Sequence, residues 1–507
     1  MPFNSLINKI MLRRIPAIEN FMKNPTDTQH KVFQYLIDSA KDTVWGKYFD
    51  YKSINDGQTF AQRIPINTYE DLQPFFSRIL KGEQNVLWSG DIKWFSKSSG
   101  TTSSRSKYIP VSKECLEECH YKGGKDMLAL YCNNHPDSGI FSGSQLALGG
   151  SPQPDSNISD IFLGDVSAIL IDNLPLWAEF YRTPKKDIAL LSDWEEKLDK
   201  MVKHVSNENV TSLSGVPSWM LVLLEKLIAY TNRNICDVWP DLEAYFHGGV
   251  SFKPYAKQFA ELLPSKVDYM ETYNASEGFF GLQDQSDNSS LLLLLDYGIY
   301  YEFIDFDTFT SVSDVHSSFL KAVSLSEVEL NKNYVMLIST NSGLWRYVIG
   351  DTVLFTQKNP YRFKITGRTK NYINICGEEV IVNNSDKAVS IAARAVNASV
   401  KDYTAAPFID KDNNIMYHQW IVEFNQEPDS MTKFSEILDE SLRNVNSDYD
   451  AKRYKNFVLQ PPAVIKAPQD TFYNWLKLHG KLGGQHKIPR LSNNRDFIEE
   501  LLHIINN

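Results

Sequence analysis

A polar run near residue 100 constrains the fold and chemistry of this chain more than any other segment. Between Lys97 and Lys107 it combines serine and threonine hydroxyls with one glycine. The flanks, Ile92–Phe95 and Tyr108–Val111, are apolar and aromatic, which predicts a β-hairpin with the polar run at its tip. Backbone N–H groups, hydroxyls and a lysine are the groups that hold a polyphosphate. The run is not a P-loop, because GxxxxGK[ST] is absent, and an exposed Ser/Thr-rich turn explains it equally well on its own.

Two later segments each place a carboxylate where a strand is expected to end. Asp268–Gly278 is typical of a strand that leads into a turn carrying Glu277, and Leu344–Val353 is typical of an apolar strand broken at Gly350 and Asp351. Ligands gather at strand ends in folds that mix helices and sheets. Glu277 suits Mg²⁺, and Asp351 suits two ribose hydroxyls. Taken singly, each acid is better explained as a turn residue that caps a backbone N–H.

Together and in this order, the three segments resemble the nucleotide-binding motifs of adenylate-forming enzymes. They are most similar to the Gretchen Hagen family of acyl acid amido synthetases, named for auxin-responsive plant members. The family's phosphate loop, Ser-Ser-Gly-Thr-Ser-x-Gly-x-x-Lys, is matched by Ser98–Lys107. Its motif Tyr-x-x-Ser-Glu is matched by Tyr273–Glu277, and its third motif by Trp345–Asp351. Gln485–Arg490 resembles the family's late lysine motif, so the resemblance spans nearly the whole chain.

The resemblance implies ATP and Mg²⁺ as cofactors and a role for each matched residue. It implies that Lys107 and Lys487 are catalytic, with Lys107 as the counter-charge of the phosphates and Lys487 approaching the α-phosphate from a mobile domain. It implies that Glu277 is the metal ligand. The residues that it implies for nucleotide binding are Ser98, Ser99, Gly100, Thr101, Thr102, Gly248, Gly249, Tyr273, Ser276, Glu277, Asp351 and Arg368.

Several of these roles have a plainer alternative. Tyr273 is expected to stack on adenine, or else to be a core tyrosine. Gly248 and Gly249 are expected to let the backbone approach adenine, or else to form an ordinary turn at a strand end. Asp351 is expected to bind the ribose, and Arg368 the ribose or a phosphate. A lysine such as Lys487 is usually a solvated surface residue, although its Lys-Ile-Pro-Arg context favours a function.

Two positions depart from the family pattern. Ser104 stands where the family usually has glycine, and serine fits there only if its φ is negative. Val348 replaces the second arginine of the third motif while Arg346 keeps the first, so one phosphate or carboxylate contact is expected to be missing.

Composition excludes several classes of protein. At 507 residues the chain is long enough for two to four domains, and 42% hydrophobic and 12% aromatic residues supply a sizeable core. The net charge of −10 argues against a nucleic-acid surface. The sparse cysteines do not predict disulfides, and Cys115, Cys119 and His120 are better explained by packing than by a metal. With no signal peptide and no long apolar run, we expect a reduced, cytoplasmic, soluble enzyme that is a monomer or weak dimer with no membrane partner.

The periodicity of the chain predicts a mixed α/β (α+β) fold. Helices are expected around Val32–Ile37, over Ser112–Cys132, Asp193–His204, from Pro217, and over Ser385–Val396, Met431–Val445 and Arg495–Ile505. Strand-like pieces mixed with glycine and proline end in Asp165–Leu170, and residues 291–353 are rich in strands. The superfamily hinge follows a Gly-Arg pair. The resemblance therefore implies a large ATP- and acyl-binding domain at 1–367, a hinge at 368–370 and a small mobile α+β domain at 371–507.

The function that follows is adenylation of a carboxylic acid and transfer of the acyl group to an amino acid. An acyl-CoA ligase would share the first step, and a non-catalytic nucleotide-binding protein would share the site alone. We find no clear basic patch for the 3′-phosphate of CoA, which favours the amide. Trp219, Leu163 and Val166 are candidates for the acyl pocket, although core packing explains each singly. The acid itself cannot be identified from these residues.

Overall fold

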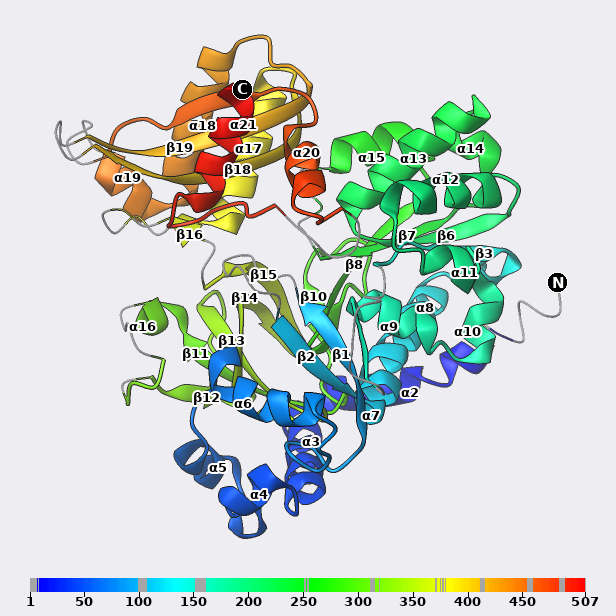
Figure 1. Ribbon diagram of the computed structural model, residues 1–507, viewed down its shortest axis with the longest axis vertical. Coiled ribbons are helices and arrows are strands. Elements are labelled where there is room, and N and C mark those ends of the chain that lie inside the picture. The colour runs from blue at the N-terminus through cyan, green and yellow to red at the C-terminus, as the bar shows by residue number, and fades with distance from the viewer. Residues whose placement is uncertain are drawn as a thin grey trace.

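The structure is a computed structural model (Figure 1). It describes residues 7, 9–98, 107–150, 161–249, 252, 255–310, 315–318, 320–369, 372–373, 375, 378, 380–410, 415–453, 459–482 and 488–506. Within these residues no helix is long and apolar enough to cross a membrane.

A long mixed sheet organises the molecule and positions the candidate site. Its strand order is β12-β11-β13-β14-β15-β10-β9-β8-β7-β6-β3-β5. The pairs from β12 to β8 are antiparallel, whereas β8, β7, β6, β3 and β5 run parallel. The strands are β3 (Ser144–Ala147), β5 (Arg182–Thr183), β6 (Val210–Gly215), β7 (Ala244–Gly248), β8 (Asp268–Ala275), β9 (Gly278–Leu282), β10 (Leu291–Leu293), β11 (Ile299–Asp305), β12 (Ala322–Ser324), β13 (Asn333–Thr340), β14 (Tyr347–Lys358) and β15 (Tyr361–Arg368).

The N-terminal helices cover the antiparallel part of this sheet. The helix predicted around Val32–Ile37 is confirmed as α3. Its apolar residues Val32, Phe33, Leu36 and Ile37 are all buried in the core of the large lobe. Gln29 fastens α3 to the sheet, because its amide donates to the carbonyls of Leu295 (2.8 Å) and Ile299 (2.9 Å). The helices of this part are α2 (Ile15–Lys23), α3 (Pro25–Ala40), α4 (Val44–Tyr48), η1 (Tyr51–Ser53), α5 (Gly57–Arg63), α6 (Tyr69–Leu80), α16 (Phe306–Thr310) and η4 (Leu325–Glu327).

The predicted hairpin is confirmed. Strands β1 (Ile92–Ser98) and β2 (Lys107–Ser112) pair antiparallel, with Ser98 opposite Lys107, and β1 also pairs with β4 (Phe162–Gly164). The predicted helix over Ser112–Cys132 is continuous but includes a π-helical segment: α7 (Lys113–Cys115), η2 (Leu116–Tyr121) and α8 (Lys122–Asn134).

Helices also cover the parallel part of the sheet. The predicted helices at Asp193 and Pro217 are confirmed, with Asp193 capping the first and Pro217 in the first turn of the second. The elements of this part are η3 (Ile140–Ser142), α9 (Val166–Asp172), α10 (Leu176–Tyr181), α11 (Lys186–Ala189), α12 (Trp194–Val205), α13 (Pro217–Thr231), α14 (Ile235–Val238) and α15 (Ala256–Leu262). The prediction of a strand-like piece at Asp165–Leu170 is wrong, because these residues belong to the segment that forms the helix α9.

The C-terminal residues form a separate lobe, drawn in yellow to red in Figure 1. Its sheet has the order β18-β19-β20, and a two-stranded ladder joins β16 to β17. The predicted helices of this part are confirmed, and α18 has the predicted bounds. The elements are β16 (Tyr372–Ile373), β17 (Val380–Ile381), α17 (Val382–Ala395), β18 (Ser399–Asp410), β19 (Ile415–Gln426), α18 (Met431–Val445), α19 (Ser447–Arg453), β20 (Ala463–Ala467), α20 (Thr471–Leu478) and α21 (Asp496–Asn506).

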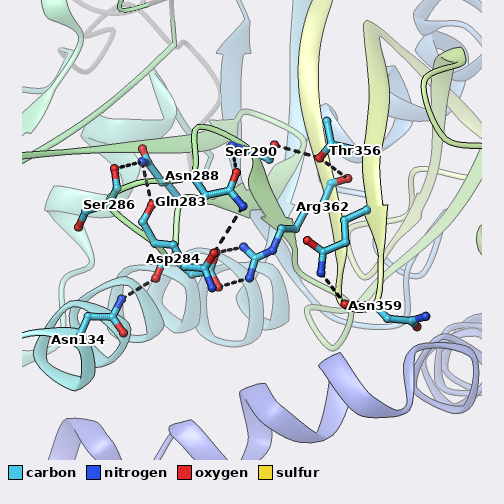
Figure 2. A network of polar contacts seen from close by, with 11 residues as sticks. Asn134, Gln283, Asp284, Ser286, Asn288, Ser290, Thr356, Asn359 and Arg362 are labelled. Carbon is cyan, nitrogen blue, oxygen red and sulfur yellow. Dashed lines mark hydrogen bonds and ion pairs between the residues drawn. The ribbon is translucent and has the colours of Figure 1, made fainter.

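A buried polar network anchors the start of β15, the strand that ends at Arg368 (Figure 2). Arg362 forms a two-point ion pair with Asp284, and both side chains are buried. Asn134 at the end of α8 donates to the carbonyl of Asp284 at 2.5 Å. Breaking such a buried pair on one side typically costs about 3–5 kcal/mol, so the network fixes β15 against its neighbours.

Candidate functional site

A cavity of about 820 Å³ lies where the C-terminal lobe meets the parallel strands of the main sheet. Residues from both lobes line it, among them Thr272, Glu277 and Arg368 of the sheet and Asp386, Asp402 and Arg490 of the C-terminal lobe. Cavities at the ends of parallel strands are common ligand sites.

The first two motifs meet through a buried hydrogen bond. Ser96 in β1 donates its hydroxyl proton to the hydroxyl of Ser276 at 2.8 Å, and both side chains are buried. Ser276 and Glu277 form the turn between β8 and β9, as the sequence predicts. The hairpin and the carboxylate of Glu277 are therefore held side by side.

The third motif joins the second through Asp351. One oxygen of this carboxylate accepts a hydrogen bond from Nε of Arg368 at 2.6 Å, and the other accepts one from the hydroxyl of Tyr273. Asp351 raises the pKa of Arg368 above its usual value. The prediction that the strand breaks at Gly350 and Asp351 is wrong, because β14 runs through both residues. Gly350 has a φ of +87° in a bulge opposite β13, a conformation that favours glycine.

Glu277 is a buried carboxyl group with a perturbed pKa. Burial, together with the charge of Asp351, raises the pKa of Glu277 to about 7, although Arg368 and Lys107 lower it. Glu277, Asp351 and Arg368 therefore interact on the wall of the cavity, and the charge of Lys107 also acts on Glu277. A buried carboxylate that is incompletely neutralised fits a divalent cation, and Mg²⁺ commonly takes one or two carboxylates with substrate phosphates. Among the described residues no cluster of three or more His, Cys, Asp or Glu side chains could hold a metal without such help.

Tyr273 lines the cavity, whereas Lys107 is not among the described residues that line it. The ammonium of Lys107 lies 5.2 Å from the ring centre of Tyr69 and lowers the pKa of Glu277. Tyr273 lines the cavity, but its ring packs at 4.9 Å from Phe280 and only 6% of the residue is exposed. The hydroxyl of Tyr273 is therefore well placed to hold Asp351, and its role in stacking stays a prediction.

The two glycines line the cavity beside these groups. Gly248 ends β7, and a Cβ there would lie 2.4 Å from the carbonyl oxygen of Thr272. Gly249 has a φ of +84°, which favours glycine. Neighbouring backbone and turn geometry therefore account for both glycines, and their approach to adenine stays a prediction.

Several predicted residues lie outside the described part of the chain, and nothing in the structure tests them. They are Ser99, Gly100, Thr101, Thr102, Ser104, Lys370 and Lys487. Ser98 is described only as the last residue of β1.

The arginine that the chain keeps from the third motif, Arg346, is not among the described residues that line the cavity. The guanidinium of Arg346 forms a buried two-point ion pair with Glu302 (2.9 and 3.0 Å) and donates to two backbone carbonyls of the α5 segment. Val348 packs against the cluster that contains Ile304 and Leu337. Val348 is not among the described residues that line the cavity, and the expected loss of one contact stays a prediction.

Of the three acyl-pocket candidates, only Trp219 lines the cavity. Leu163 and Val166 pack in the protein core, as the plainer alternative predicted.

Sequence reasoning missed Lys197, a buried lysine of α12. Its ammonium donates to the carbonyls of Gly149 (2.8 Å) and Gly150 (2.9 Å), and burial lowers the pKa of Lys197 to about 8. Both glycines line the cavity. The signal was present, because Lys197 lies on the apolar face of an amphipathic helix with Trp194 and Met201.

Arg490 joins the two lobes next to the cavity. It forms an ion pair with Asp402, stacks at 4.5 Å over the ring of Tyr403, and donates to the hydroxyl of Tyr255 at 3.1 Å. Burial raises the pKa of Asp402 to about 6 even though Arg490 opposes the shift. Since Tyr255 precedes α15 of the large lobe, this hydrogen bond links the two lobes.

Comparisons with known proteins agree with this geometry. Residues 14–267 match the GH3 family N-terminal domain, residues 292–368 its central domain and residues 383–496 its C-terminal domain. Two Arabidopsis thaliana relatives are a 4-substituted benzoates-glutamate ligase, GH3.12 (24% identical; 86% of this chain, 87% of the relative), and an indole-3-acetic acid-amido synthetase, GH3.4 (22%; 94% and 91%).

Solved structures show the same fold. The GH3.15 acyl acid amido synthetase superposes with a TM-score of 0.77 at 18% identity, covering 97% of this chain and 95% of that one. A 2-hydroxyisobutyryl-CoA ligase superposes with a TM-score of 0.60 at 13% identity, covering 95% and 91%. The mixed fold with a large N-terminal and a smaller C-terminal part, expected from the sequence, is confirmed.

Proposed function

Because the chain belongs to the GH3 family, we propose that it is an ATP-dependent acyl acid amido synthetase. In the first step a carboxylate oxygen of the acid attacks the α-phosphorus of ATP, and pyrophosphate leaves. In the second step the amine of an amino acid attacks the acyl carbon, AMP leaves, and the amine loses a proton. The observation that carries this proposal is the convergence of Glu277, Asp351 and Arg368 on one cavity, with Lys107 close enough to lower the pKa of Glu277.

Each of these side chains has a task in the first step. Asp351 accepts hydrogen bonds from the ribose, with Tyr273 and Arg368 holding its two oxygens. Arg368 and Lys107 stabilise the negative charge that develops on the phosphates; losing one such group typically costs about 2.7–4 kcal/mol in the barrier. Glu277 holds Mg²⁺, which when bound neutralises phosphate oxygens.

The remaining roles rest on the sequence. The hairpin tip from Ser98 to Thr102 cradles the β- and γ-phosphates, and Lys487 stabilises the transferring α-phosphate. We place the hinge at 368–370, with the large domain at 1–367 and the small one at 371–507. The separate C-terminal sheet and the contact of Arg490 with Tyr255 support two bodies that dock and separate. We further propose a cytoplasmic monomer or weak dimer that uses small-molecule substrates.

Acid-dependent exchange of labelled pyrophosphate into ATP tests the first step. The protein should show exchange with at least one member of a carboxylic-acid panel, and Asp351→Asn should abolish it while Asp237→Asn, at an exposed site, should not. Amino acids and CoA are then supplied as acceptors with the active acid. An amide product supports the proposal, and a thioester alone would make the protein an acyl-CoA ligase. No exchange with any acid would leave a nucleotide-binding protein.

A further inference from the structure

One face of the parallel strands forms a floor that runs from the nucleotide end of the cavity into the large lobe. Gln145 and Ala147 of β3, Ser212 and Ser214 of β6, and Phe246 and Gly248 of β7 all line the cavity. They alternate along their strands, so they share one face of the sheet. The register agrees, since Gln145 pairs with Ser212, and Ser214 pairs with both Ala147 and Phe246.

The floor is open because most of these side chains are small. Larger apolar and aromatic residues form the rest of the cavity wall, among them Leu128, Phe141 and Trp177. The open floor reaches well beyond the glycine turn. Ser212 pairs with Ala244, four residues before Gly248. This separation is about 13 Å along the strands and about 10 Å across from β8 to β6. A single small ring attached to the carboxylate would leave the far end empty.

The far end carries polar groups that have no partner. The hydroxyls of Ser212 and Tyr181 are buried and make no hydrogen bond within the described residues, and Ser212 is only 1% exposed. Gln145 pairs with Ser212 on the same floor, and Tyr181 lines the cavity next to β5, the neighbour of β3. Buried polar groups without partners destabilise a protein, so a ligand that bonds to them is favoured. A purely hydrocarbon tail would leave them unpaired.

We propose that the acyl substrate is an elongated carboxylic acid with a hydroxyl or carbonyl group at the end remote from its carboxylate. The carboxylate lies at the nucleotide end, the body lies between the small-residue floor and the aromatic wall, and the distal group bonds with Ser212, Gln145 or Tyr181. This inference rests on the proposed function, because it takes the cavity beyond Gly248 as the acyl site.

The test is pyrophosphate exchange with three acids: benzoic acid, 6-phenylhexanoic acid and 6-(4-hydroxyphenyl)hexanoic acid. The hydroxylated long acid should exceed its unsubstituted partner in kcat/KM by about 10-fold, as one recovered hydrogen bond implies. Ser212→Ala should reduce this ratio toward one. Ser218→Ala, at a cavity-lining serine of α13 away from the floor, should keep the ratio.

A second variant tests the channel independently of the hydroxyl. Ala147→Leu places a larger side chain on the floor, so it should lower kcat/KM for both long acids at least 10-fold more than it lowers kcat/KM for benzoic acid. Retained activity with benzoic acid also shows that the variant is folded. Equal rates for the two long acids, or a block that affects all three acids alike, would overturn the inference and leave the proposed function standing. Absence of exchange with these and all other acids would instead overturn the proposed function.

Discussion

The raised pKa of Glu277 gives a prediction about stability that is separate from catalysis. Glu277 is 8% exposed and has a pKa of about 7, against 4.5 for an ordinary glutamate. The folded state therefore binds a proton that the unfolded state has lost between these two values. Stability must fall as the pH rises through this window, because the folded protein holds more protons than the unfolded one.

The size of this loss of stability follows from the difference between the pKa of Glu277 in the folded protein and that of an ordinary glutamate. At 1.36 kcal/mol per pKa unit, an ionised Glu277 destabilises the ligand-free protein by about 3 kcal/mol above pH 8. Glutamine keeps the shape and carries no charge. Glu277→Gln should therefore raise the thermal midpoint at pH 8 by a few degrees and have little effect at pH 5, where the glutamate is mostly protonated in the folded state.

Thermal unfolding from pH 5 to pH 9, without nucleotide or Mg²⁺, measures this effect. Glu118→Gln, at an exposed glutamate of the same lobe, is the matched control and should follow the parent at every pH. In the same preparations, Glu277→Gln should lose most pyrophosphate exchange and need more Mg²⁺ for what remains. The reasoning is refuted if Glu277→Gln and the parent show the same pH dependence of stability.

Three further predictions concern other parts of the site. Lys487→Ala should slow adenylate formation far more than it weakens ATP binding, because the lysine acts in the transition state; equal pyrophosphate exchange in variant and parent would remove this role. Lys370→Pro should restrict the hinge and impair amide formation selectively in single-turnover assays, and equal losses in both half-reactions would favour a rigid site. Lys197→Met should leave the carbonyls of Gly149 and Gly150 unpaired and destabilise the protein by about 1–3 kcal/mol in urea unfolding at pH 7, whereas an unchanged midpoint would show that these bonds contribute nothing.

Local patterns were enough to predict much of the fold. The apolar flanks of the polar run predicted the β1–β2 hairpin, and helical periodicity predicted α18 with its observed bounds, Met431–Val445. Both signals lie within one element, where period and turn chemistry decide the structure. The prediction for Asp165–Leu170 was wrong because short apolar runs carry little information on period. The run is short and contains the buried residues Val166, Ala168 and Ile169, and the period of so few residues cannot separate a strand from the helix α9.

These local patterns could not predict which strands pair across long distances in the sequence. The sequence indicated that Glu277, Asp351 and Arg368 carry chemistry, but only the register of β14 with β15 sets Asp351 opposite Arg368. Arg346 matched a functional motif, yet its partner is Glu302 in β11, which no local spacing relates to it. The polar floor of the cavity was missed because Gln145 and Ser212 become neighbours only when β3 and β6 pair.

Transfer of oxygen from the acid to AMP tests the central claim most directly. The active acid, labelled with ¹⁸O in its carboxylate, is incubated with ATP, Mg²⁺ and an amino acid, and the products are analysed by mass spectrometry. Attack of the carboxylate on the α-phosphorus predicts one ¹⁸O atom in AMP for each amide formed, with none in pyrophosphate. Label in inorganic phosphate together with ADP, or amide formed with unlabelled AMP, would contradict an acyl-adenylate and with it the roles given to Lys107, Glu277, Asp351 and Arg368.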